Sequence, residues 1–181
     1  NNKKSFNKAK NNYLKSDETK TNIFRNKLLD SKFEKIIGVS WKSSSSNANK
    51  NISLEELILG IYSPKIRIVC LQYGEVEEEI NHLRSKHGIE ISLLKDVDKF
   101  NDIDSLSALI NACDEIVSID NSTGILAGAL GSNCNLLLKI DSYWYWGIND
   151  YQSCWFPKIK LFRQTKIGNW ENPLKSIKKH L

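Results

Sequence analysis

The sequence predicts an α/β protein built on a Rossmann-like, doubly wound parallel sheet of about six strands. Short apolar runs alternate with helical patterns along most of the chain, as expected when helices connect parallel strands. The largely apolar run at 115–119 has the composition of a strand that is buried on both faces. Asp120 ends this run, and a helix rich in small residues follows it.

The expected elements follow one another in short order. Hydrophobic period and flanking polar residues place strands at 36–41, 66–71, 89–93, 115–119, 135–139 and 160–162. Helices are expected at 54–59, 75–86, 105–112, after residue 121 and at 172–180, the last with Pro173 in its first turn. We expect residues 1–34 to form a basic linker or helical segment and 35–181 to form the Rossmann-like domain. Ligands of such sheets bind at the carboxyl ends of the strands, so site residues are expected just after strands.

Composition narrows the class of protein. The chain has 181 residues, 40% of them hydrophobic, which suffices for one well-buried α/β domain. No stretch approaches the roughly 20 apolar residues of a membrane span, and no signal peptide opens the sequence, so we expect a cytoplasmic protein. The four cysteines form no CxxC pair, which argues against a zinc site and a disulfide scaffold. The absence of methionine suggests a piece of a longer protein.

Positive charge is concentrated at the start of the chain. Residues 1–50 hold twelve Lys and Arg against four Asp and Glu, so the other residues carry a net charge of −3 within the total of +5. Such a segment suits nucleic acid or acidic lipid, but no interleaved aromatic residues or recognition motif accompany it. We therefore favour a solvated linker or helix and expect no nucleic-acid partner.

The turn after residue 119 is the first candidate site. Asn121, Ser122 and Thr123 offer small hydrogen-bonding side chains where a helix begins, and Gly124 follows them. The N–H groups and positive dipole end of that helix would point at the carboxyl edge of the sheet, where they stabilise an anion such as a phosphate. An ordinary capped turn between strand and helix has the same sequence features, and both interpretations stay open.

Two more loops follow strands. The loop at 41–46 holds Lys42, Ser43, Ser44 and two further serines, a combination suited to wrapping phosphate oxygens. Gln72 and Tyr73 follow the next strand, where they suit hydrogen bonding and stacking with a nucleoside. A low-complexity surface loop and a plain helix-entry turn are the respective alternatives. The convergence of three loops at one sheet edge favours a nucleotide or another phosphorylated ligand.

Several motifs occur in a fixed order. They are IGVSW at 37–41, CLQYG at 70–74, Asp104 with SALI at 107–110, Asp114, the segment 120–131, WYW at 144–146, WFP at 155–157 and LFRQ at 161–164. Together they resemble the C-terminal half of bacterial glycosyltransferases that are often fused to tetratricopeptide repeats and are similar to the ADP-heptose–lipopolysaccharide heptosyltransferase family. The resemblance extends from about Tyr13 to the end of the chain.

The resemblance implies the C-terminal domain of a GT-B fold, which holds a nucleotide-sugar donor as substrate and needs neither a cofactor nor a metal. It assigns Ser122, Thr123 and Gly124 to the diphosphate, Lys42 and its neighbouring serines to the leaving nucleotide, and Gln72 to the nucleoside pocket. The acceptor and the catalytic base belong to the N-terminal half of such enzymes. We therefore expect this chain alone to bind donor but to transfer no sugar.

Other residues leave the interpretation open. Trp144 and Trp146 suit either stacking on a base or sugar or the closing of a core. Relatives carry His where this chain has Ile125, and isoleucine donates no hydrogen bond to phosphate. A degenerate, non-catalytic interaction or nucleotide-binding module is therefore the alternative function. The acidic pairs at 96–98 and 102–104 mimic the DxD metal motif of a different transferase fold, and we assign them to a solvated loop.

Overall fold

The computed structural model describes residues 12–44, 50–148 and 150–181. Its strands are β1 Lys35–Ser40, β2 Ile66–Cys70, β3 Ile91–Ser92, β4 Glu115–Ile119, β5 Cys134–Leu138 and β6 Ile159–Arg163. The helices are α1 Glu18–Leu28, α2 Leu54–Ile61, α3 Glu77–His87, α4 Ile103–Asn111, α5 Ser122–Leu130 and α6 Glu171–Lys178, with a short 3-10 helix, η3, at Trp144–Trp146. The predicted alternation of strands and helices is confirmed.

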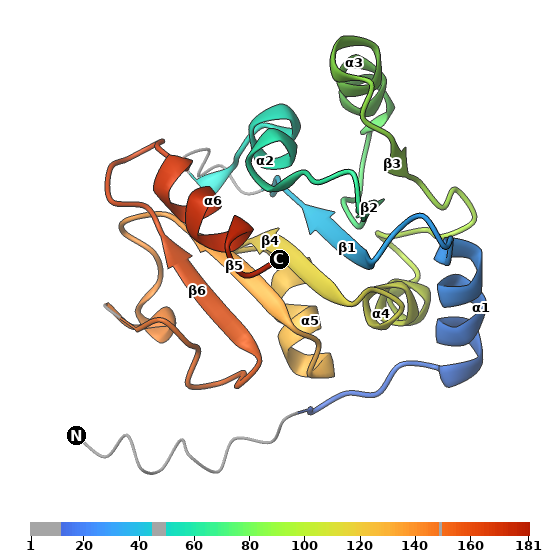
Figure 1. The fold of residues 1–181 in the computed structure, drawn as a ribbon. Helices are drawn as coiled ribbons and strands as arrows, with labels where there is room; N and C mark the ends of the chain where they lie inside the picture. Colours follow the sequence, from blue (N-terminus) through green and yellow to red (C-terminus); the bar gives the residue numbers. More distant parts are fainter. Residues whose placement is uncertain (1–11, 45–49, 149) are drawn as a thin grey trace.

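All six strands run parallel in one sheet, in the order β3-β2-β1-β4-β5-β6 (Figure 1). The path through the sheet starts at the central strand β1 and moves outward through β2 to the edge strand β3. The chain then returns to β4, on the other side of β1, and moves outward through β5 to β6. β1 and β4 are therefore neighbours, and their registers pair Val39 with Val117 and Ser40 with Ser118. Loops that leave these two strands diverge, which opens a crevice at their carboxyl ends. The predicted Rossmann-like fold is thus confirmed.

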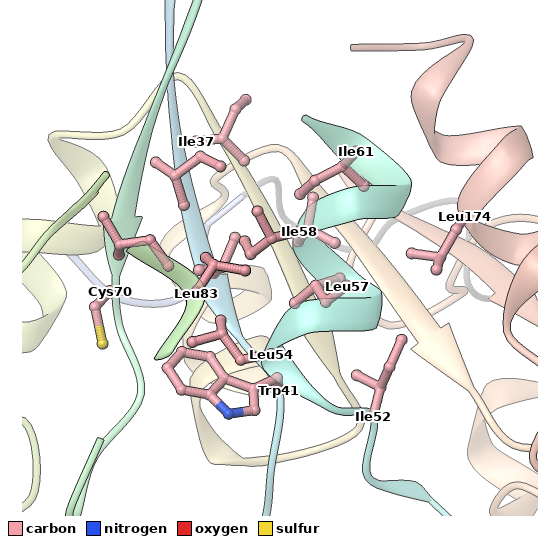
Figure 2. Close-up of a cluster of buried hydrophobic side chains, with 14 of the residues drawn as sticks. Ile37, Trp41, Ile52, Leu54, Leu57, Ile58, Ile61, Cys70, Leu83 and Leu174 are labelled. Atoms are coloured by element: carbon pink, nitrogen blue, oxygen red, sulfur yellow. The ribbon is translucent and has the colours of Figure 1, made fainter. Parts of the chain in front are cut away.

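Helices cover both faces of the sheet, and each face has its own core. Side chains of α2, α3 and α6 pack on one face, and those of α1, α4 and α5 on the other. Because neighbouring residues of a strand point to opposite faces, Ile37 and Val39 of β1 join the first core and Ile36 the second. Figure 2 shows Leu54 and Ile58 of α2 pointing toward β1.

Helix α1 belongs to the packed structure. Asp17 caps it by accepting a hydrogen bond from the Lys20 N–H at 2.8 Å, and Phe24 is buried in the second core. Arg25 donates to the Ala112 carbonyl at 2.9 Å and forms an ion pair with Asp114 at 2.7 Å. Arg25, a cation of the basic segment, is therefore engaged within the fold.

The expected element bounds differ from the observed ones mainly at sheet edges. The strand predicted at 89–93 pairs with β2 only through Ile91 and Ser92, since β3 is the edge strand. Residues 103–104, predicted as loop, open helix α4, and Asp102 caps it by accepting from Ser105 N–H at 2.9 Å. Within the described part of the chain, no helix combines the length and apolar character that crossing a membrane requires.

Candidate functional site

The N-terminus of α5 lies at the carboxyl end of β4, as the sequence predicted. Asn121 is the N-cap: its Oδ1 accepts from the Gly124 N–H at 3.1 Å and from Ser118 Oγ at 3.0 Å. Its Nδ2 donates to Ser40 Oγ at 2.8 Å and to the Lys42 carbonyl at 3.2 Å. Asn121 therefore ties β1 to α5, and its amide is used within the protein.

The first turn of α5 places Ser122, Thr123 and Gly124 together. Ser122 is exposed, whereas Thr123 is only 1% exposed and its Oγ1 has no hydrogen-bond partner. A side chain at Gly124 would meet Leu136 Cδ1 at 2.6 Å, so glycine lets the helix start close to the sheet. Buried hydroxyl groups are normally paired, which makes Thr123 a candidate donor to a bound ligand.

Lys50 brings a positive charge to the same place. Its side chain is 8% exposed, and Nζ donates to the Asp120 carbonyl at 3.0 Å, directly before α5. Lys139, which follows β5, is also buried and forms an ion pair with Asp141 at 3.2 Å. Burial raises the pKa of the Asp120 carboxyl, while Trp146, Lys50 and Lys139 favour its ionised form. Two buried cations and a helix N-terminus therefore meet beside Asp120.

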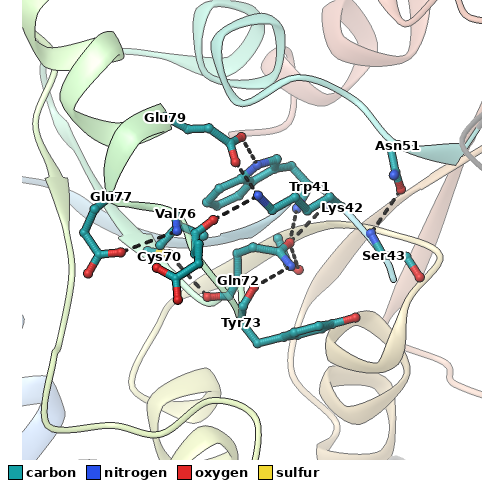
Figure 3. Close-up of polar contacts among 12 residues, drawn as sticks. Trp41, Lys42, Ser43, Asn51, Cys70, Gln72, Tyr73, Val76, Glu77 and Glu79 are labelled. Carbon is teal, nitrogen blue, oxygen red and sulfur yellow. Dashed lines mark hydrogen bonds and ion pairs between the residues drawn. The ribbon is translucent and has the colours of Figure 1, made fainter. Parts of the chain in front are cut away.

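Lys42 points elsewhere. Its ammonium forms an ion pair with Glu79 of α3 and donates to the Glu75 carbonyl at 3.1 Å. The other carboxylate oxygen of Glu79 accepts from the Trp41 indole N–H at 2.8 Å (Figure 3). The charge of Lys42 is thus balanced inside the protein, on the α3 side of the crevice. Lys50, from the same connection, is the lysine that contacts the residue directly before the N-cap of α5.

Gln72 holds the two central loops together. Its Oε1 accepts from Ser40 Oγ at 3.0 Å and from the N–H groups of Trp41 and Lys42 at 3.0 and 2.9 Å (Figure 3). Its Nε2 donates to the Tyr73 carbonyl at 3.2 Å. Because Gln72 is buried and bonded on both amide atoms, it shapes the crevice as a bridge between β1 and β2.

A cavity of about 400 Å³ lies beyond β2 and β3. The rings of Tyr73 and Phe100, 5.7 Å apart, stand at its border, and Gln72 also lines it. The Ser44 N–H donates to the Tyr73 hydroxyl at 3.4 Å, and the Ser43 N–H donates to Asn51 Oδ1 at 3.0 Å. Ser44 therefore contacts an aromatic residue of this cavity, but neither Ser43 nor Ser44 lines it. The further serines of the predicted loop, Ser45 and Ser46, lie outside the described residues.

Trp144 and Trp146, which the sequence assigns either to ligand stacking or to a core, have different environments. Trp146 is 2% exposed and belongs to the second core, whereas Trp144 is 81% exposed. Arg163 holds this turn by donating to the carbonyl groups of Gly147 at 2.9 Å and Trp146 at 3.4 Å. Trp146 is therefore a core residue below Asp120, and only Trp144 keeps a ring free for stacking.

Carboxylates of the acidic pairs are engaged within the protein, and Asp98 among them lines the cavity beyond β2 and β3. Asp96 pairs with Lys27 at 2.6 Å, Asp98 accepts from Asn101 Nδ2 at 2.8 Å, and Asp102 caps α4. Among the residues that the structure describes, no group of three or more His, Cys, Asp or Glu is arranged to hold a metal ion.

Sequence reasoning missed Lys50, Lys139 and Asp120 as site residues. Lys139 directly follows β5, but the sequence pattern predicts it as the last residue of that strand. Lys50 precedes the first apolar residue after a polar loop, and no periodic pattern distinguishes it from Lys42.

Several solved glycosyltransferases have the same architecture. The chain has the fold of one half of the ADP-heptose lipopolysaccharide heptosyltransferases, as the sequence resemblance predicted. E. coli ADP-heptose lps heptosyltransferase II superposes with a TM-score of 0.65 at 17% identity, over 92% of this chain and 51% of that one. E. coli heptosyltransferase WaaC, solved with ADP, gives 0.56 at 13% identity over 92% and 49%.

Two further proteins are similar to this chain. A glycosyl transferase family 9 structure from Veillonella parvula gives a TM-score of 0.58 at 13% identity, over 84% of this chain and 42% of that one. Protein FlbA of Caulobacter vibrioides is 32% identical over 138 residues, which cover 75% of this chain and 23% of FlbA. The chain thus spans about half the length of these solved transferases and about a quarter of FlbA. No family model matches the sequence.

Proposed function

We propose that this chain is the nucleotide-sugar-binding half of a metal-independent GT-B glycosyltransferase. The observation that carries the proposal is the presence of a buried cation and of a buried hydroxyl without a partner at the start of α5. Lys50 lies beside the N-terminus of α5, where the buried Thr123 hydroxyl has no partner. A diphosphate would bind there, because it accepts hydrogen bonds and its negative charge is favoured by the helix dipole.

The nucleoside would occupy the cavity beyond β2 and β3. Tyr73 and Phe100 offer aromatic faces at its border, and stacking on such rings suits any base. The cavity and the α5 N-terminus lie along one edge of the sheet, since both follow the carboxyl ends of strands. An extended nucleotide would span the two.

In the proposed reaction, a base deprotonates the acceptor hydroxyl, which attacks the sugar carbon as the bond to the diphosphate breaks. Lys50 and the α5 N-terminus would stabilise the negative charge that develops on the leaving diphosphate. Because these two groups supply positive charge, the proposed reaction needs no metal ion. The acceptor site and the base belong to a second half, since the solved transferases are about twice as long as this chain. Tetratricopeptide repeats remain a proposed further part of the parent chain.

A second candidate is a degenerate module that binds nucleotide without turnover. The observation that favours it is Ile125, which lies in the first turn of α5. Many of the transferases that this sequence resembles have a histidine at that position. Both candidates keep the crevice and predict nucleotide binding. They differ in whether sugar is transferred once an acceptor-binding half is supplied.

Two lysine variants test where the diphosphate binds. We expect Lys50→Ala to lower nucleoside diphosphate affinity roughly tenfold or more, because a charge-assisted hydrogen bond is lost. Lys42→Ala removes the same charge from the Glu79 side and should change affinity by less than about twofold. Calorimetric titration with ADP, UDP and GDP measures both. If Lys42→Ala lowers the affinity more than Lys50→Ala does, the diphosphate binds on the α3 side instead.

A third variant separates binding from folding. Thr123→Val removes a hydroxyl that has no partner in the free protein, so the free energy of unfolding should stay the same or rise. The affinity for the best nucleoside diphosphate should fall roughly tenfold, because a buried bond to a charged group is worth about 1.5–3 kcal/mol. Unchanged affinity would remove Thr123 from the site, and the failure of every nucleotide to bind the parent chain would contradict the proposal as a whole.

A further inference from the structure

Gln164 is a buried amide whose polar atoms lack partners. It directly follows β6, and its backbone N–H donates to the Leu138 carbonyl at 2.9 Å. The residue is 2% exposed, and neither Nε2 nor Oε1 makes a hydrogen bond. Burying an unpaired amide costs stability that an apolar side chain of similar size would not. Such a group in a folded protein needs an explanation, and a ligand is one.

Unpaired polar atoms gather at one edge of the sheet. In the described parts of the chain, the buried side-chain atoms without partners belong to Thr123, Asn135, Trp146 and Gln164. The Trp146 indole belongs to the second core and has the Asp120 carboxyl as a neighbour. Thr123 and Gln164 lie just beyond the carboxyl ends of β4 and β6, whereas Asn135 stands at the start of β5. Two buried side chains whose polar atoms lack partners therefore lie at the edge of the sheet where ligands of this fold class bind.

Gln164 has a charged neighbour on the adjacent strand. The register of β5 and β6 pairs Leu138 with Arg163, and its continuation places Lys139 beside Gln164. Lys139 is itself buried, and its ammonium lies near enough to Asp120 to favour the ionised carboxyl. Gln164 therefore extends the polar cluster at α5 toward β6.

The direction of the donor along the sheet follows from the two subsites already described. The nucleoside cavity lies at the β2 and β3 end, and the diphosphate position lies between β1 and β4. In a nucleotide sugar the diphosphate separates the nucleoside from the sugar. A molecule laid along the edge in this order carries its sugar over β5 and β6.

We propose that the Gln164 amide hydrogen-bonds hydroxyl groups of the donor sugar and helps to decide which sugar is accepted. This inference rests on the proposed function. A primary amide offers two donors and one acceptor, which match neighbouring hydroxyls of a sugar ring. Because Gln164 is 2% exposed, a neighbouring side chain must turn aside when the sugar binds, and Lys139, whose ion-pair partner Asp141 is exposed, is the neighbour that we propose moves. A site that hydrogen-bonds a hydroxyl rejects sugars that lack it, because the buried amide is then left unpaired.

The test compares nucleotide sugars with their own nucleoside diphosphates. The 181-residue chain is titrated with ADP, UDP and GDP and with ADP-glucose, UDP-glucose, UDP-N-acetylglucosamine and GDP-mannose. We expect one nucleotide sugar to bind more tightly than its diphosphate. In Gln164→Met, which keeps the length of the side chain, that sugar should bind roughly threefold to tenfold more weakly. Affinity for the diphosphate should be unchanged.

Thermal unfolding of the ligand-free proteins supplies a second readout. Gln164→Met and Gln164→Leu should unfold at the same temperature as the parent or higher, because an unpaired amide is removed. Asn135→Ala is the matched control: its amide donates to Glu115 at 2.7 Å, so the variant should unfold at a lower temperature and keep the affinity ratio of sugar to diphosphate.

Three results would count against the inference. If the ratio of sugar affinity to diphosphate affinity is unchanged in both Gln164 variants, the amide does not contact the sugar. If these variants also unfold at a lower temperature than the parent, the role of Gln164 is structural. If the parent binds every nucleotide sugar and the corresponding diphosphate equally tightly, the proposed sugar subsite is wrong, although the proposed nucleotide site is unaffected. If no nucleotide binds, the proposed function and this inference fail together.

Discussion

At the scale of single residues, Ile125 offers the most direct gain of function. It lies in the first turn of α5 with its side chain 39% exposed, and its N–H donates to the Asn121 carbonyl at 3.2 Å. A histidine there would start from the same turn as Thr123 and from an exposed position. Ile125→His should therefore add one hydrogen bond to a bound diphosphate, worth about 1 kcal/mol or roughly a fivefold gain in affinity.

The gain should depend on pH. Imidazole is protonated below its ordinary pKa of about 6.5, and the cation is the better partner for a diphosphate. Titrations of parent and variant with ADP, UDP and GDP at about pH 6 and pH 8 measure the difference. Equal affinities at both pH values would mean that residue 125 does not reach the phosphates.

The sequence predicted part of the candidate site residue by residue. Thr123 and Gly124 were found because a small-residue helix start after a buried strand has a recognisable composition. Lys42 and Lys50 belong to the same connection between β1 and α2, and the sequence does not tell which of them turns inward. That choice depends on Glu79, which lies on α3 and attracts Lys42 across the crevice. Such a contact between distant segments leaves no local pattern.

At the scale of elements, α5 depends on close packing against β6. A side chain at Gly128 would meet Ile159 Cδ1 at 2.6 Å and Phe156 Cγ at 2.7 Å. We expect Gly128→Ala to lower the free energy of unfolding by about 1–3 kcal/mol, because overpacking outweighs the helix propensity gained. Chemical denaturation measures the change. Ile125→Ala on the exposed side of the same helix is the control, and an equally stable Gly128→Ala variant would contradict the tight fit.

Helices α2 and α3 are joined by a cluster that responds to acid. Hydrogen bonds from Lys86 and His87 lower the pKa of the Glu55 carboxyl from its ordinary 4.5 to about 2. The unfolded chain therefore takes up this proton first as the pH falls. The stabilisation is present above about pH 4.5 and is lost as the pH falls toward 2.

Denaturation of Glu55→Gln between pH 6 and pH 2 tests this cluster. The variant should be less stable than the parent at pH 6 and should lose less stability on acidification. Glu56 on the same helix is the matched control, because burial raises the pKa of its carboxyl. Glu56→Gln should therefore leave the acid-induced loss as steep as in the parent or make it steeper. Parallel curves for parent and Glu55→Gln would rule out the cluster as a source of acid sensitivity.

The elements themselves were largely predictable. Strands such as β2 and β5 are apolar runs with polar ends, and their type follows from hydrophobic period alone. The packing of α1 was not predictable, because its sequence is mostly polar and only Phe24 and Leu28 are buried. What fixes α1 is its contact with α4, including the Arg25 and Asp114 ion pair, and neither partner reveals the other in the sequence.

At the scale of the whole molecule, two cores on one sheet indicate a unit that folds alone. We expect the 181-residue chain to unfold in a single cooperative transition and to bind a nucleotide. It should transfer no sugar, because the proposed acceptor site and base lie in another half. Circular dichroism during denaturation and a product assay with a nucleotide sugar and added acceptors measure these properties. Sugar transfer by the isolated chain would show that it holds a complete active site.

The parallel, doubly wound sheet was predicted from the alternation of elements, but its strand order was not. The order depends on β4 returning to the side of β1, which buries Val39 and Val117 next to each other. This return also creates the crevice, so the position of the site is a consequence of topology.

The indole of Trp41 gives the chain an optical probe of its own. Its N–H is bonded to the same carboxylate that holds Lys42, and its ring is buried in the first core. Indole emission responds to the electric field around the ring, and a charged nucleotide that binds in the crevice changes that field while the pair of Lys42 and Glu79 stays intact. Light emitted at this wall of the crevice thus reports occupancy without any attached dye.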